Sequence, residues 1–138
     1  MSQVKSRLIE VVGMSFVPGY PANLHRLREL QEKQAVASLE GGEFGDSYEP
    51  EPLAAVIIRN PENEYDANAC EVHVPTLGRK GMVGHVPKEL AARLAPLMDG
   101  GAQVRGWVEF VRVMPGKEGN PGLTIGVEVD RSTMNQEQ

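Results

Sequence analysis

The chain has one cysteine, few aromatic residues and no long apolar run. The single cysteine, Cys70, excludes an internal disulfide and fits a reducing cytoplasm. No apolar stretch approaches the roughly 18 residues of a membrane span, and the N-terminus lacks the apolar core of a signal peptide. We therefore expect a cytoplasmic protein without a membrane partner.

The composition is that of a soluble globular protein. The 138 residues are 41% hydrophobic and 24% charged, which suits one domain with a buried core. Aromatic residues make up only 5%, so each ring carries more weight than usual. With 15 glycines and 10 prolines, short strands joined by turns are favoured over a helical bundle.

The net charge of −5 argues against a general nucleic-acid binder. The acidity is local, because residues 21–52 carry three basic and seven acidic side chains. Residues 53–115 carry seven of each and are neutral. An acidic segment of this kind is suited to contact with a basic protein partner.

Periodicity predicts about six strands and two helices. Strands are expected at 7–16, 53–59, 70–75, 82–86, 103–113 and 123–129. One helix is expected from Asn23 to about Leu39, and another from Pro87 to Gly100. With no βαβ alternation, this order predicts a small, mostly antiparallel barrel with helices packed on it.

The connection at residues 60–69, Asn-Pro-Glu-Asn-Glu-Tyr-Asp-Ala-Asn-Ala, is longer than a plain hairpin needs. Asn and Asp side chains fold turns by bonding nearby backbone N–H groups, so Asn63 and Asp66 could serve the turn itself. The turn also presents Tyr65 beside Asp66, and loops on rigid scaffolds are common binding sites. Both roles remain open.

No pattern of metal ligation or catalysis is visible. Glu62, Glu64 and Asp66 alternate, but the loop lacks the glycine and the distal glutamate of an EF-hand. The histidines show no zinc spacing, and no triad, P-loop or dinucleotide fingerprint occurs. We expect no metal, no cofactor and no enzyme activity, and we interpret Cys70 as a small core residue.

Three blocks in order resemble the HIRAN domain. They are Val-Val-Gly-Met-Ser-Phe at 11–16, the turn at 60–69, and Gly-Met-Val-Gly-His-Val-Pro-Lys-Glu-Leu-Ala at 81–91. The resemblance implies an OB-like antiparallel β-barrel over residues 8–130, with 1–7 as an N-terminal extension and 131–138 as a flexible tail. It also implies a module that captures the 3′-hydroxyl end of single-stranded DNA in replication or repair.

The same resemblance assigns roles to seven residues. Rings of Phe16 and Tyr65 would stack on bases, and Asp66 would accept the hydrogen bond of the 3′-hydroxyl. Phosphate contacts fall to the other positions, which are Asn63, His85 and Lys88, and Ser15 stands where some members carry a basic residue.

Other interpretations of these residues exist. Phe16 could be a core residue, Tyr65 could pack into the barrel end, and His85 could be a hydrogen-bonded structural histidine. Lys88 could be a solvated side chain. The alternative function is that of a protein-interaction adaptor, whose acidic segment at 21–52 recruits a helicase or nuclease. We expect a monomer or a weak oligomer.

Overall fold

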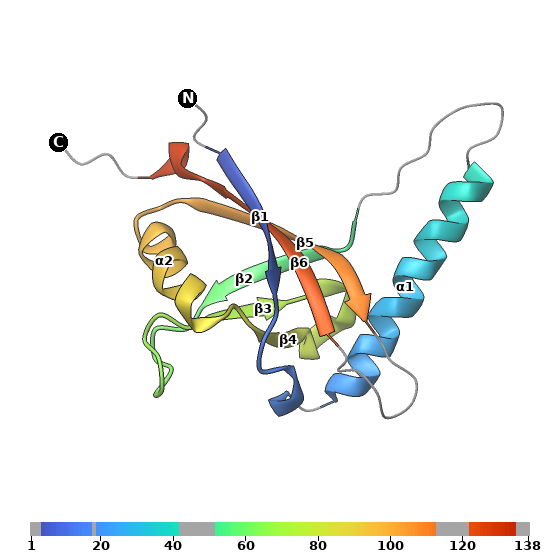
Figure 1. Cartoon of the computed structure of the whole chain (residues 1–138), viewed down its shortest axis with the longest axis horizontal. Coiled ribbons are helices and arrows are strands. Elements are labelled where there is room, and N and C mark those ends of the chain that lie inside the picture. Colours follow the sequence, from blue (N-terminus) through green and yellow to red (C-terminus); the bar gives the residue numbers. More distant parts are fainter. Residues whose placement is uncertain (1–3, 18, 42–51, 113–121, 135–138) are drawn as a thin grey trace.

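The computed structural model describes residues 4–17, 19–41, 52–112 and 122–134. In chain order the elements are β1 (Val4–Glu10), η1 (Met14–Phe16), α1 (Tyr20–Gly41), β2 (Ala54–Arg59), β3 (Cys70–His73), η3 (Pro75–Lys80), β4 (Met82–His85), α2 (Lys88–Asp99), β5 (Gln103–Arg112), β6 (Gly122–Asp130) and η4 (Arg131–Thr133). The prediction of a mainly β fold with six strands and two α-helices is confirmed (Figure 1).

The six strands form one antiparallel sheet in the order β1-β6-β5-β2-β3-β4. The sheet curls, but its ladder does not close between β1 and β4. The two outer strands meet through one isolated bridge, in which Val12 and His85 exchange backbone hydrogen bonds of 2.9 and 2.8 Å. The fold is therefore an OB-like barrel that is closed at one end and open along the rest of β1.

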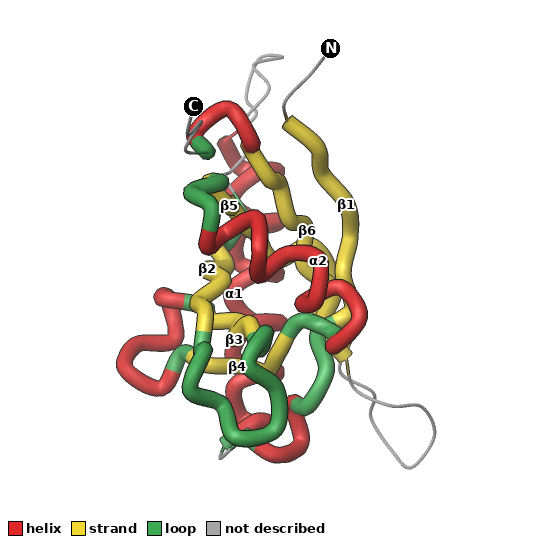
Figure 2. The backbone as a smooth tube through the Cα atoms, turned by 90° about the vertical axis from the view of Figure 1, so that its left-hand side faces the viewer, coloured by secondary structure: helices red, strands yellow, loops and turns green. Residues whose placement is uncertain are grey.

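The core lies inside this curled sheet. Strand β2 alternates buried and exposed residues, as a sheet with one covered face should. Fully buried aliphatic side chains come from several strands, among them Val72, Val111 and Ile125. Helix α2 covers the open end with Ala91, Leu94 and Ala95, and Figure 2 shows it in front of β6.

Helix α1 is longer than predicted, and its contacts with β5 include Arg28 and Gln31, which donate to the carbonyl oxygens of Val111 and Glu109. It begins at Tyr20, directly after Gly19 with its positive φ of 80°, and three residues before the predicted start at Asn23. Leu24 and Leu27 are buried, whereas Val36 and Ala37 further along the helix are exposed. Figure 1 shows the helix running away from the sheet. No helix in the described ranges is long and apolar enough to cross a membrane.

The first strand is shorter than predicted, and the difference matters for the site. Strand β1 ends at Glu10 because Gly13 adopts a left-handed φ of 72° and turns the chain into η1. Gly84 makes room for this crossing, since a Cβ there would lie 2.6 Å from both the Val12 carbonyl oxygen and the Val11 side chain. Phe16 thus lies in a turn beyond the strand.

Candidate functional site

Two aromatic rings project into solvent at the end where the barrel closes. Phe16 is 88% exposed and Tyr65 is 86% exposed. In Figure 1 the turn that carries Phe16 and the connection between β2 and β3 both lie at the lower end of the molecule. The alternatives that placed Phe16 in the core and Tyr65 inside the barrel end are wrong. Rings this exposed are available to a flat ligand.

The connection at 60–69 is held by its own side chains. The Oδ1 atom of Asn63 accepts hydrogen bonds from the backbone N–H groups of Tyr65 (2.9 Å) and Asp66 (3.1 Å). The Oδ1 atom of Asp66 accepts one from the Asn68 N–H (2.9 Å). The structural interpretation of these residues is therefore correct. Within the described ranges the amide N–H₂ of Asn63 and the Oδ2 atom of Asp66 keep no hydrogen-bond partner.

Arg59 braces this connection from outside. Its Nη1 atom donates to the carbonyl oxygens of Ala67 (3.0 Å) and Ala69 (3.1 Å), while Nε and Nη2 donate to the Asp99 carboxylate at 3.0 and 3.1 Å. The hydrogen bonds between the Arg59 guanidinium and the Asp99 carboxylate raise the pKa of Arg59 and lower that of Asp99. Sequence reasoning missed the brace, although an arginine at the end of an apolar strand was a visible signal.

A polar row crosses the strands beside His85. Glu71 pairs with His85 across β3 and β4, and its two carboxylate oxygens bond the Nε2 atom of His73 (2.9 Å) and the Nδ2 atom of Asn60 (3.0 Å). The half-buried His85 side chain faces Gly13, whose Cβ would lie 3.8 Å from its Nδ1 atom. Glu71 and His73 were not among the predicted residues.

Lys88 is exposed in the first turn of α2. Within the part of the chain that the structure describes, no carboxylate pairs with it. A lysine at a helix N-terminus is unfavourable for the helix dipole, so this position gains nothing for stability from the charge. Its ammonium group is free to meet an anion.

Backbone bonds bring the three blocks to one place. The bridge between Val12 and His85 sets η1, with Ser15 and Phe16, beside the end of β4. The Val86 N–H donates to the Cys70 carbonyl (2.9 Å), which holds the start of α2 against the end of the 60–69 connection. The predicted residues therefore belong to one end of the barrel.

The single thiol of the chain is poorly placed to act as a nucleophile. Cys70 is fully buried, and burial raises the pKa of its thiol, which disfavours the nucleophilic thiolate. The described residues contain no group of three His, Cys, Asp or Glu side chains positioned to hold a metal ion. The end of the barrel offers stacking surface, carboxylate oxygens that include Oδ2 of Asp66, an amide donor and a cation.

Comparison with known proteins adds a family and two solved structures. The family model of the HIRAN domain matches residues 7–130. The crystal structure of the HIRAN domain of human HLTF is similar, with 23% identity, a TM-score of 0.55, and coverage of 92% of this chain and 80% of that one. A Lactobacillus plantarum protein gives 18% identity, a TM-score of 0.58, and coverage of 91% and 96%. No curated protein matches this chain.

Proposed function

Because the family model covers residues 7–130, the chain belongs to the HIRAN domain family, and we propose that it is a non-enzymatic module that binds the 3′-hydroxyl end of single-stranded DNA in replication or repair. Family membership supports the coarser part of this statement, a nucleic-acid-binding module. The finer part rests on the chemistry of the site, and above all on the two exposed rings.

Phe16 and Tyr65 supply the binding surface. At 88% and 86% exposure these two residues bury little apolar area in the free protein, so a stacked base removes ring faces from water. Such stacking is worth roughly 1–3 kcal/mol per base and depends little on sequence. The pair therefore suits unpaired nucleotides, whose faces are accessible.

Asp66 supplies the discrimination between a strand end and a strand interior. A carboxylate repels phosphate and is useful to a DNA-binding site only where the ligand presents a donor. The 3′-hydroxyl is such a donor, and the Oδ2 atom of Asp66 has no partner in the described residues. The free amide donors of Asn63 would bind phosphate oxygens, and the positive charge of Lys88 would attract them. His85 adds a ring nitrogen on the same end.

The experiment compares two fluorescent oligonucleotides that differ only at the terminus. One ends in a 3′-hydroxyl and the other in a 3′-phosphate, and both are titrated by fluorescence anisotropy. We expect tighter binding of the hydroxyl end. Equal affinity for the two would remove end recognition, and absence of binding to both would remove the function.

Single substitutions test the role of each residue in binding. Asp66→Asn keeps an acceptor for the Asn68 N–H and should abolish the preference, whereas Glu64→Gln, on the same exposed loop, should keep it. Tyr65→Ala should weaken both oligonucleotides by about 5- to 150-fold. Lys88→Ala should weaken both and reduce the slope of log affinity against log salt by about 0.7.

The adaptor function remains the alternative. Helix α1 runs past the sheet and exposes Val36, so it offers a surface to another protein. Its acidic residues Glu29 and Glu32 pair with Arg26 and Arg28, which reduces the negative charge available to a basic partner. Residues 42–51 of the predicted acidic segment lie outside the described residues. A pull-down with the full chain that recovers a helicase or nuclease, and loses it when α1 is altered, would favour this function.

A further inference from the structure

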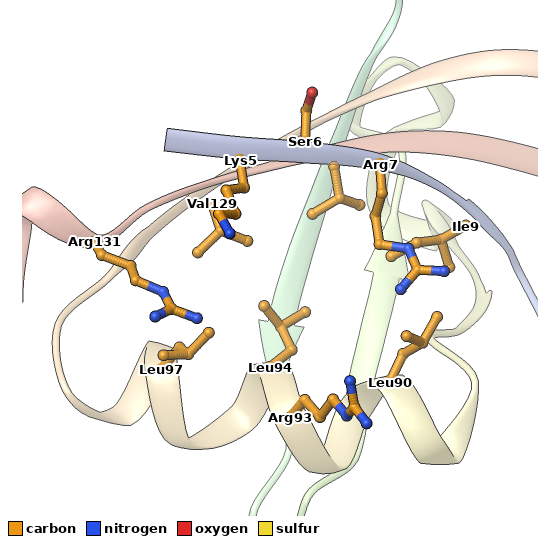
Figure 3. Close-up of a pocket in the computed structure, with 11 residues that line it drawn as sticks. Lys5, Ser6, Arg7, Ile9, Leu90, Arg93, Leu94, Leu97, Val129 and Arg131 are labelled. Carbon is orange, nitrogen blue, oxygen red and sulfur yellow. The ribbon is translucent and has the colours of Figure 1, made fainter. Parts of the chain in front are cut away.

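A groove of about 260 Å³ lies between β1 and α2, away from the site described above. Its floor is aliphatic and is built from β1, β6 and α2, with Leu90 and Leu94 on the helix side. Figure 3 shows the basic side chains Arg7 and Arg93 at one end of the groove and Lys5 and Arg131 at the other. None of the seven residues predicted for DNA binding lines it.

The charge of this groove has one sign. Four cationic side chains line it and no acidic side chain among the described residues does. No ion pair in the described ranges involves any of the four, whereas Arg59 and Arg112 each have a carboxylate partner. Unpaired cations around an apolar floor match a ligand that carries both acidic and apolar groups.

The groove also presents an open strand edge. The Val11 N–H donates to the Leu123 carbonyl, so by alternation the residues that bond β6 are Ile9, Arg7 and Lys5. The backbone groups of Ser6 and Leu8 then point away from β6, on the side where the barrel is open. Ser6 lines the groove although its hydroxyl points away from it in Figure 3, because its backbone faces the cavity.

The position of this edge follows from how the barrel closes. The chain reaches β4 just after β1 ends, at the bridge between Val12 and His85, and among the described residues β1 itself has no backbone pairing with β4. Beyond His85 the chain turns into α2, so a helix stands where a neighbouring strand would complete the sheet. Figure 2 shows α2 and β1 converging at their lower ends and separating above.

We propose that this groove binds an extended, acidic and apolar peptide segment of a partner protein, which adds as a strand to β1. Backbone hydrogen bonds would run to Ser6 and Leu8, apolar side chains would rest on Leu90 and Leu94, and carboxylates would meet Arg7 and Arg93. Strand addition at an open edge is a recurrent mode of peptide recognition. Single-stranded DNA fits less well, because none of the described residues that line the groove is aromatic and bases would not use the strand edge.

The test uses a fluorescein-labelled heptapeptide of alternating leucine and glutamate, titrated into the full chain by anisotropy. A leucine and lysine peptide of the same length is the charge control. We expect the acidic peptide to bind and the basic peptide not to bind. Failure of the acidic peptide to bind at about millimolar protein, a weak limit for such contacts, would overturn the proposal.

Two further experiments test the backbone hydrogen bonds and the charge contacts of the peptide without disturbing the fold. N-methylation of alternate peptide amides, in both registers, should weaken binding in one register by about tenfold or more, because it removes donors to the β1 edge. Arg7→Glu with Arg93→Glu should weaken binding by about tenfold or more. The exposed Arg105→Glu on β5 is the matched control and should have little effect. Unchanged affinity after methylation in both registers would overturn strand addition.

A last arm separates this site from the DNA site. A 3′-phosphate oligonucleotide is titrated into wild type and the Arg7 and Arg93 double variant. Dependence of DNA binding on these two arginines, with no competition from the peptide, would assign the groove to DNA and overturn the proposal. If the double variant loses peptide binding but binds DNA normally, the peptide proposal is supported. If Asp66 proves not to recognise the strand end, the proposed DNA function fails while the peptide proposal stands.

Discussion

The hydrogen bonds of Arg59 predict how much stability the substitution Arg59→Met removes. Methionine keeps an unbranched apolar stem but removes all the guanidinium donors. The bonds lost are two to the carbonyl oxygens of Ala67 and Ala69, and two to Asp99, whose side chain is 58% exposed. Surface ion pairs contribute little, so most of the effect comes from the carbonyl bonds. The expected loss of unfolding free energy is about 1.5–3 kcal/mol.

At this chain length about 4 °C of melting temperature corresponds to 1 kcal/mol, so Arg59→Met should melt about 6–12 °C below wild type. Circular dichroism follows the melt. Asp99→Asn is the control, since it leaves the bonds to the carbonyl oxygens in place and should lower the melting temperature less. The reasoning is refuted if Arg59→Met melts like wild type, or if the two variants lose equal stability. Arg59→Met should also bind oligonucleotide more weakly, because the Tyr65 connection is loosened.

Three other predictions concern stability and reactivity. Gly84→Ala should destabilise the fold by about 1–3 kcal/mol in urea, because the new methyl group collides with the Val12 carbonyl, and a wild-type midpoint would contradict this. The hydrogen bond from Arg112 lowers the pKa of Glu10, so this carboxylate stabilises the fold above its ordinary pKa of 4.5 and loses that contribution as pH falls through the lower folded value. Glu10→Gln should therefore shrink the stability difference between pH 7 and pH 3, measured by urea midpoints. The Cys70 thiol should react with Ellman's reagent far more slowly in the native protein than in urea, since burial hides it and raises its pKa; equal rates would show that the strand opens readily.

Much of the fold could be predicted because local patterns are strong in this chain. Alternating apolar residues locate the later strands to within one or two positions. The Asn and Asp residues of 60–69 fold their own turn, so the roles of Asn63 and Asp66 in the turn follow from local chemistry. Exposure of Phe16 and Tyr65 could not be decided from sequence, because an aromatic ring fits a core and a ligand equally well.

The contacts that sequence reasoning missed are those between distant positions. Arg59 and Asp99 are separated by 40 positions, and Glu10 and Arg112 by 102. Nothing in a local pattern reports which charges the sheet order will bring together. The first strand was predicted too long because the residues after Glu10 remain apolar, and only the left-handed backbone at Gly13 ends the ladder.

The groove beside β1 also lay beyond sequence reasoning. Its cations come from three separate segments, and each segment alone resembles an ordinary solvated surface. They share one cavity because β6 pairs with β1 and because α2 follows β4 directly. The topology of the sheet, rather than a sequence motif, brings these four cations together.

The clasp formed by Val12 and His85 consists of main-chain atoms alone. The side chains at these two positions can therefore change without moving Phe16, which follows in η1, provided that residue 84 remains a glycine. A chain of the same fold can thus replace the imidazole of His85 and change the contacts of that ring. The spacing between the two exposed aromatic residues, Phe16 and Tyr65, would stay the same.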